Sequence, residues 1–245
     1  MTDGFKFTPK KSGLAAALDQ AQKQEGLIKK ESKALSQEIK YSKPEDCSER
    51  IRIVFDDSGS MAGPKITDAI EGCVEFMRNC VLNQTAVSIH PMNKVADQQL
   101  EPLTTNLPAL SVAVKALVGP DGYIIVSGST PLFETFDRAQ KMNPKASRYV
   151  IFSDGQPNNT EKKEQCLTQA IEEKTPVDTV FISIGDSDYG AALLKEIADR
   201  TGGYFLKFDR NKVNFKSAFK YLAPTLRLQL HDGNVRKALE EGRLK

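Results

Sequence analysis

Short apolar runs alternate with helical stripes of apolar residues along most of the chain after residue 50. Five runs are typical of buried parallel strands, which are apolar on both faces: 51–55 (IRIVF), 86–90, 149–153, 177–185 and 203–208. Between them, apolar residues recur every three or four positions, as on one face of an α-helix, over 66–81, 107–118, 132–142, 166–171, 191–198 and 215–222. This alternation predicts an α/β fold with a doubly wound, mostly parallel, Rossmann-like sheet and helices on both faces.

Two short segments fit this pattern less well. Residues 99–103 predict an edge strand, because Pro102 lacks the N–H group that a central strand needs. The apolar run at 123–126 is too short to be assigned to a strand or a helix.

The two ends of the chain differ from the middle. Residues 1–49 are interpreted as a helical arm and linker, whose interrupted apolar seam consists of Leu14, Leu18, Ala21, Ile28, Leu35 and Ile39. This helix either lies on the domain's own surface or serves as a docking or oligomerisation helix. Residues 50–222 form the main domain, and residues 223–245 a C-terminal tail of mixed charge with a weak helical stretch at 235–239. The tail is expected to be a solvated extension.

Composition and charge narrow the class of protein. Lys and Arg number 34 against 32 Asp and Glu, for a net charge of +2, and Trp is absent. Nucleic-acid binding therefore gains no support. No apolar stretch approaches the about 18 residues of a membrane span, and no secretory signal opens the chain. We expect a cytoplasmic protein that does not enter a membrane.

The four cysteines, at 47, 73, 80 and 166, show neither a CxxC pair nor zinc-finger spacing. Cys73 and Cys80 fall on one predicted helix, where a separation of about 10.5 Å prevents a disulfide. All four are expected to be free thiols that pack in the interior.

Polar residues that carry chemistry follow three of the apolar runs. Asp56 and Ser58 follow the first strand, Thr130 follows the run at 123–126, and Asp154 follows the strand at 149–153. In a doubly wound sheet, sites form in the loops at the carboxyl ends of strands. Carboxylate and hydroxyl oxygens without His or Cys suit a hard cation such as Mg²⁺. Taken singly, each residue is more typical of a helix cap or turn.

Three motifs in order resemble the von Willebrand factor A (VWA) domain. The sequence FDDSGSM at 55–61 resembles the D-x-S-x-S motif, GSTPL at 128–132 the second loop with its threonine, and FSDGQP at 152–157 the third loop with its aspartate. Ser129 replaces a frequent glycine. Residues 102–104 stand at the family's antiparallel edge strand, and TGGYF at 201–205 resembles its last strand.

The resemblance implies a complete metal-ion-dependent adhesion site (MIDAS) of the intracellular type. Its ligands to one Mg²⁺ or Mn²⁺ would be Asp56, Ser58, Ser60, Thr130 and Asp154. One coordination position would stay open for an Asp or Glu of a protein partner. Asp57, at the variable position of the motif, is expected to face solvent. Gly63, Asp97, Gly128, Asp186 and Asp188 would lie in loops that shape specificity.

The resulting expectation is a non-enzymatic, metal-dependent protein-interaction module. It would act as an adaptor or subunit in an intracellular assembly, as VWA proteins do with AAA+ ATPases of the MoxR or CobS type and in tellurite-resistance-like stress systems. One alternative is a structural subunit whose metal stabilises an interface. Another is a Mg²⁺-dependent phosphatase like the haloacid dehalogenases, but Ser58 stands where those enzymes need an aspartate as general acid. With two His in the chain, a Ser-His-Asp triad is not favoured.

Overall fold

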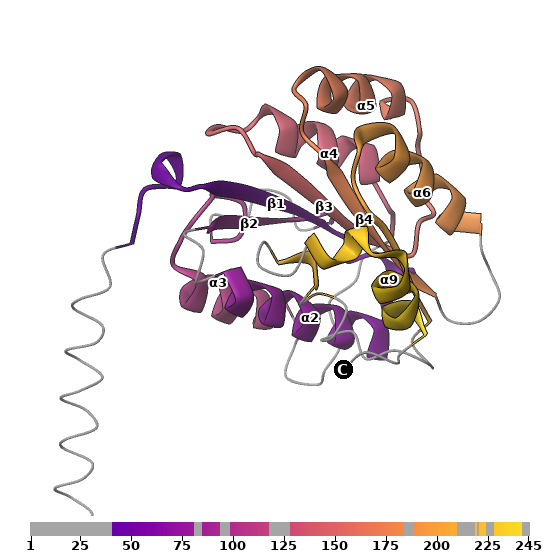
Figure 1. Cartoon of the computed structure of the whole chain (residues 1–245), viewed down its shortest axis with the longest axis horizontal. Coiled ribbons are helices and arrows are strands. Elements are labelled where there is room, and N and C mark those ends of the chain that lie inside the picture. The colour runs from indigo at the N-terminus through magenta and orange to yellow at the C-terminus, as the bar shows by residue number, and fades with distance from the viewer. Residues whose placement is uncertain are drawn as a thin grey trace, which may run out of the picture. The chain divides into compact units, whose positions relative to one another are not determined.

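The five predicted strands all form, and they pair in parallel in this computed structural model (Figure 1). The strands are β1 (Glu49–Phe55), β2 (Thr85–Pro91), β3 (Arg148–Ser153), β4 (Val177–Ser183) and β5 (Phe205–Asp209). Their order in the sheet is β2-β1-β3-β4-β5. In the central pair, Ile53 of β1 stands opposite Val150 of β3.

The structure describes residues 41–80, 85–93, 99–117, 128–183, 189–209, 219, 221–223 and 228–241. By its internal contacts the chain separates into two units, Met1–Tyr41 and Ser42–Lys245. The predicted N-terminal helix, the run at 123–126 and most of the helix at 215–222 lie outside the described residues, as do Asp97, Asp186 and Asp188.

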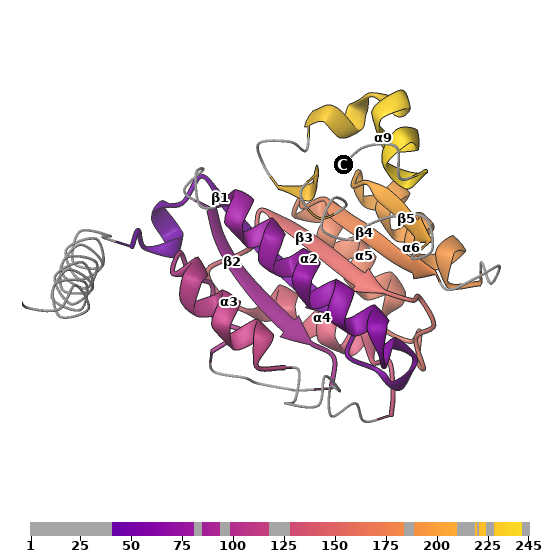
Figure 2. The ribbon, with the colours of Figure 1, turned by 90° about the horizontal axis from the view of Figure 1, so that it is seen from below.

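Helices cover both faces of the sheet. On one face lie α2 (Pro64–Cys80) and α3 (Leu107–Lys115), and on the other lie α4 (Leu132–Lys141), α5 (Lys163–Glu172) and α6 (Tyr189–Thr201) (Figures 1 and 2). Successive strand residues point to opposite faces. Ile53 and Phe55 therefore join the core with α2 and α3, whereas Val54 joins the core with α4, α5 and α6.

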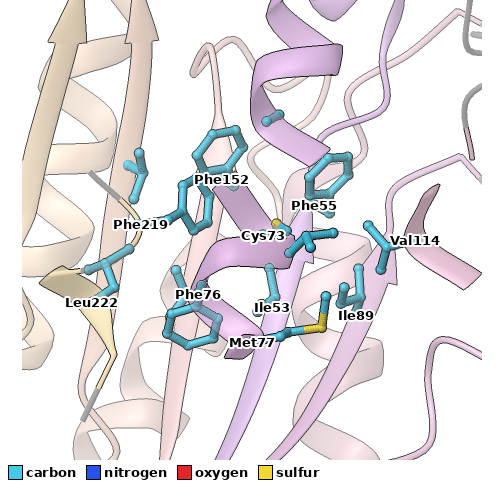
Figure 3. Packing of buried hydrophobic residues seen from close by; sticks show 14 of the residues in the cluster. Ile53, Phe55, Cys73, Phe76, Met77, Ile89, Val114, Phe152, Phe219 and Leu222 are labelled. Atoms are coloured by element: carbon cyan, nitrogen blue, oxygen red, sulfur yellow. The ribbon is translucent and has the colours of Figure 1, made fainter. Parts of the chain in front are cut away.

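An aromatic stack fills the core beneath α2 (Figure 3). The rings of Phe55 and Phe152 stack at 5.8 Å between centroids, and Phe152 lies 4.5 Å from Phe219. Gly72 of α2 gives the ring of Phe219 its room, because a Cβ at that position would overlap the ring. The last predicted helix thus contributes to the core through Phe219.

The strand order places a topological switch point between β1 and β3. The chain passes from β1 to β2 on one side, then returns across β1 to β3, β4 and β5 on the other. Connections leave the carboxyl ends of β1 and β3 toward opposite faces, and in doubly wound sheets ligands bind outside the strand ends at such a point. The loops after β1 and β3 are the ones that carry Asp56 and Asp154.

A buried ion cluster joins the opposite end of the sheet. Arg148 of β3 pairs with Asp178 of β4 at 2.8 Å and with Glu49 of β1 at 2.7 Å. It also donates a hydrogen bond of 2.9 Å to the carbonyl of Leu222. Arg148 and Asp178 are both buried, so each needs the other as its charge partner.

Three expectations for the periphery need correction or refinement. Residues 99–103 form no strand, but the segment still contacts β2: an isolated antiparallel bridge links Thr104 to Val87, and the N–H of Ile89 donates to the carbonyl of Leu100 at 2.7 Å. The expected helical stretch of the tail forms, as α9 (Gly233–Glu240), but the tail also reaches the core: the 3₁₀ helix η4 (Leu228–His231) buries Leu230 there, and Val235 of α9 packs against it. The expected linker carries the 3₁₀ helix η1 (Pro44–Asp46).

Two expectations about the cysteines are confirmed. The four cysteines are buried and free. Cys73 and Cys80 both lie in α2. Among the described helices, none has the length and apolar character needed to cross a bilayer.

Candidate metal centre

Asp56 is held rigidly where β1 ends. Its N–H donates to the carbonyl of Phe152 at 2.9 Å, which continues the pairing of β1 with β3. One carboxylate oxygen, Oδ1, accepts from the N–H of Ser58 at 2.9 Å, and the other accepts from the hydroxyl of Ser153. The side chain is fully buried. Burial raises the pKa of Asp56, hydrogen bonds from Ser153 and Ser58 oppose this rise, and repulsion from Asp154 adds to it.

The two serines of the D-x-S-x-S motif lie together just after Asp56. Ser58 Oγ and Ser60 Oγ are 3.0 Å apart, with Ser58 buried and Ser60 exposed. The intervening chain forms the 3₁₀ helix η2 (Gly59–Met61), which Met61 anchors in the core. The first loop therefore presents two hydroxyl oxygens beside a buried carboxylate.

Thr130 is fixed by the third loop. The side-chain oxygen of Asn158 accepts from the N–H of Thr130, and the N–H of Asn158 donates back to the Thr130 carbonyl at 3.1 Å. The same carbonyl accepts from Leu132 at 2.9 Å as α4 begins. This reciprocal pair fixes the backbone of the second loop against the loop that carries Asp154.

The sequence predicted that Asp57 faces solvent, but the structure buries it. Only 1% of it is exposed, and its Oδ1 accepts from the backbone and side-chain nitrogens of Asn93, at 2.8 and 3.1 Å. The Asn93 side chain also donates to the carbonyl of Ser129 at 3.0 Å. Asp57 therefore links the first loop, the end of β2 and the second loop.

Asp154 follows the carboxyl end of β3, and its two carboxylate oxygens differ in their partners. Its Oδ2 is 3.2 Å from the ammonium of Lys65, while its Oδ1 is buried without a hydrogen-bond partner among the described residues. Gly155 follows with φ +84°, in the left-handed region. A Cβ on Gly155 would lie 2.5 Å from the backbone oxygen of Gly190 at the start of α6.

The donor set suits a hard divalent cation. It comprises two carboxylates and three hydroxyls, and hard cations favour such oxygen ligands together with water. The unpartnered Oδ1 of Asp154 and the repulsion between Asp154 and Asp56 are features that a cation would relieve. In the described residues no three His, Cys, Asp or Glu side chains gather to hold a metal. The proposed centre does not require such a group, because three of its five ligands are hydroxyls and only two are carboxylates.

Sequence reasoning missed four residues that shape this centre: Asn93, Ser153, Asn158 and Lys65. Asn93, Ser153 and Asn158 hold the ligand loops by hydrogen bonds to residues that are 36, 97 and 28 positions away, respectively. Nothing in the local sequence signals such distant pairs. Lys65 stands in the first turn of a helix, where a solvated lysine is the ordinary expectation.

Comparison with known proteins gives structural matches only, since no family model and no curated protein matches this sequence. BatB from Bacteroides thetaiotaomicron is 17% identical with a TM-score of 0.57, the match covering 76% of this chain and all of BatB. The VWA domain of SpRpn10 is 11% identical with a TM-score of 0.56, over 72% and 95% of the two chains. Manganese-loaded TRAP protein of Plasmodium vivax is 17% identical with a TM-score of 0.52, over 74% of each chain. The α/β domain described here therefore has the VWA fold.

Proposed function

We propose that this protein is a metal-dependent protein-interaction module of the VWA type. Asp56, Ser58, Ser60, Thr130 and Asp154 would hold one Mg²⁺ or Mn²⁺ at the ends of β1 and β3. The ion would supply an electrophilic position for an Asp or Glu side chain of a partner. The partner would be recognised by coordination of its carboxylate to the ion, so no bond of the partner needs to be formed or broken covalently.

One observation supports the proposal most directly: Asp154, in the segment that resembles the family's third loop, keeps a buried carboxylate oxygen with no hydrogen-bond partner among the described residues. This oxygen lies at the switch point of a sheet whose fold is shared with a manganese-loaded protein, TRAP. The neighbouring loops offer the hydroxyls of Ser58 and Ser60, which are neutral ligands. Neutral ligands leave more of the ion's charge available to an incoming carboxylate.

The protein's own residues would prepare this site for a partner. Asn93 and Asn158 hold the second loop from two sides, which fixes the backbone of Thr130 before any ion arrives. The glycines at 63 and 128 have positive φ and lie in loops near the same end of the sheet, where they permit tight turns. A partner would therefore meet a preformed surface, which reduces the entropic cost of binding.

We propose a cytoplasmic assembly as the setting, with an AAA+ ATPase of the MoxR or CobS type as the partner. An interaction module also agrees with Ser58 better than a phosphatase does, because a serine hydroxyl cannot protonate a leaving group at neutral pH.

Metal binding is tested first, by titrating Mn²⁺ and following the free-ion signal by electron paramagnetic resonance. Thr130→Val removes a proposed ligand hydroxyl while keeping the side chain's shape. Thr105→Val is the matched control, because Thr105 bonds the carbonyl of Ser42 in the segment before β1. We expect one Mn²⁺ site in the wild type and in Thr105→Val, and binding weakened at least tenfold in Thr130→Val. Equal binding in all three proteins, or none in any, would contradict the proposed site.

Partner binding is tested next, by capture from native lysate with mass spectrometry. Four conditions are compared: wild type with Mg²⁺, wild type with EDTA, Asp154→Ala with Mg²⁺, and Thr105→Val with Mg²⁺. A partner lost with EDTA and with Asp154→Ala but kept with Thr105→Val supports recognition through the metal. A partner kept in all four conditions contradicts it. Size-exclusion chromatography with EDTA addresses the structural alternative, which predicts an oligomer that the chelator dissociates.

A further inference from the structure

Lys65 lies inside the cluster of proposed metal ligands. From the first turn of α2, its ammonium donates to the carbonyl of Ser60 at 2.8 Å and to Asp154 Oδ2 at 3.2 Å. The Lys65 side chain is 13% exposed and that of Asp154 is 12% exposed. One ammonium thus connects the first loop to the third, and both residues that it contacts belong to the proposed ligand set.

The ammonium of Lys65 binds the same carboxylate that a metal ion would bind, that of Asp154. Lys65 places one positive charge 3.2 Å from the carboxylate of Asp154. Repulsion from this same carboxylate helps to raise the pKa of Asp56. A divalent ion bound by Asp154 would bring two further positive charges next to the ammonium. Because the pair is largely shielded from water, repulsion between the two cations would be screened only weakly.

A lysine side chain is well suited to leave Asp154 when a metal ion binds. Its charge is a single point on a four-carbon chain with free rotation, unlike the planar fork of arginine. The residue stands in the first turn of α2 and is not a member of the hydrophobic core, so an outward turn of its side chain would leave that core intact. Withdrawal would release Asp154 Oδ2 and the Ser60 carbonyl together.

We infer that Lys65 competes with the metal ion for Asp154 and thereby sets the metal affinity of the site, an inference that rests on the proposed function. In the metal-free protein the ammonium holds the first and third loops together. When the ion binds, Asp154 exchanges the ammonium for the metal. The lysine therefore raises the ion concentration at which the site fills and keeps the loops arranged below that concentration.

The test is the dissociation constant for Mn²⁺, measured by electron paramagnetic resonance at fixed pH and ionic strength on the full chain. Lys65→Gln removes the charge, and Lys65→Met removes the charge and every donor but keeps the aliphatic chain. Lys163→Gln is the matched control, because Lys163 is also partly shielded, at 21% exposed, and pairs with Glu196 of α6. Thermal unfolding in EDTA, followed by circular dichroism, confirms that each variant folds.

We expect both Lys65 variants to bind Mn²⁺ about tenfold more tightly than the wild type, the effect of losing one charge-assisted hydrogen bond from the competing state. Lys163→Gln should bind like the wild type. In EDTA the Lys65 variants should unfold at a lower temperature, so that their stabilisation by Mn²⁺ is larger. A merely structural lysine would lower stability without tightening metal binding.

Two results would overturn the inference, and they differ in meaning. If the wild type binds Mn²⁺ and the Lys65 variants bind it equally or more weakly, the competition is wrong while the proposed metal site stands. If neither the wild type nor any variant binds Mn²⁺, the proposed function fails and the inference fails with it.

Discussion

His90 should make the stability of this protein sensitive to mild acid. The imidazole lies in β2 with no exposed surface. Arg52 Nη1 is 3.3 Å from its Nε2, which Ser88 Oγ also contacts at 2.9 Å. An arginine can only donate, so Nε2 must accept and the ring must be neutral. Glu101 Oε1, 3.8 Å from Nδ1, would favour the charged ring. Burial, Arg52 and Arg138 outweigh it and lower the pKa of His90 to about 3.

The size of the effect follows from the two pKa values. The ordinary pKa of the imidazole is 6.5, and it applies to the unfolded chain. Between pH 7 and pH 5 the unfolded chain takes up a proton at this residue, whereas the folded protein takes up almost none. Stability from a lowered pKa is present above 6.5 and is lost as the pH falls from 6.5 toward 3. The loss by pH 5 is about 2 kcal/mol, since one pKa unit corresponds to about 1.4 kcal/mol.

The assay is urea unfolding of the wild type and His90→Gln at pH 7 and pH 5. Because the chain has no tryptophan, unfolding is followed by far-ultraviolet circular dichroism. EDTA keeps metal binding out of the measurement. Glutamine keeps an acceptor for Arg52 but does not titrate, so its loss between the two pH values should be smaller by about 2 kcal/mol. Equal losses in the two proteins would refute the assignment of a buried neutral histidine.

Three further substitutions test other features. Asp56→Asn should stabilise the metal-free protein at pH 7, because burial raises the pKa of Asp56 and so disfavours its charged form in the folded protein. Urea unfolding in EDTA should show this gain in unfolding free energy disappearing as the pH falls below the pKa of the folded carboxyl. Titration with Mn²⁺ should show weakened metal binding. Gly155→Ala should lower the unfolding free energy by about 2 kcal/mol or more, through strain at φ +84° and overlap with Gly190. The matched control Gly202→Ala, at φ +73° in open space, should lose about 1 kcal/mol, and an equal loss would contradict the overlap. Arg148→Met should cost about 3–5 kcal/mol because it breaks a buried ion pair by removing the guanidinium that lies 2.8 Å from Asp178; unchanged urea unfolding would contradict this role.

The positions of the five strands along the chain were predictable because buried parallel strands are marked by their composition. The run IRIVF at 51–55 places apolar residues on both faces of the strand and is interrupted only by Arg52. The tail was mispredicted for the opposite reason. Leu230 lies between Gln229 and His231, and Val235 between Asn234 and Arg236, so the local pattern does not mark either residue as part of the core that both contact. The segment at 99–104 forms a bridge rather than a strand, and Pro102 had already signalled weak pairing there.

At the candidate site, the sequence predicted the ligand-bearing loops but not the contacts that hold them. Asp56, Thr130 and Asp154 fall in motifs whose spacing is visible along the chain. The burial of Asp57 depends on Asn93, which is 36 residues away and follows a different strand. The ion pair of Lys65 spans 89 residues. Such pairs follow from the order of strands in the sheet, and the local pattern of residue types carries no record of them.

The close approach of Gly155 and Gly190 has an evolutionary consequence. Each glycine occupies the volume that a Cβ on the other would need, and in both cases the obstacle is backbone, which cannot rotate away. A side chain at either position would require the third loop and the start of α6 to separate. Selection should therefore keep both positions as glycine, or change them together with the length of the connection between them. In diverged homologues this pair should persist beside the D-x-S-x-S motif even where the overall sequence identity has become very low.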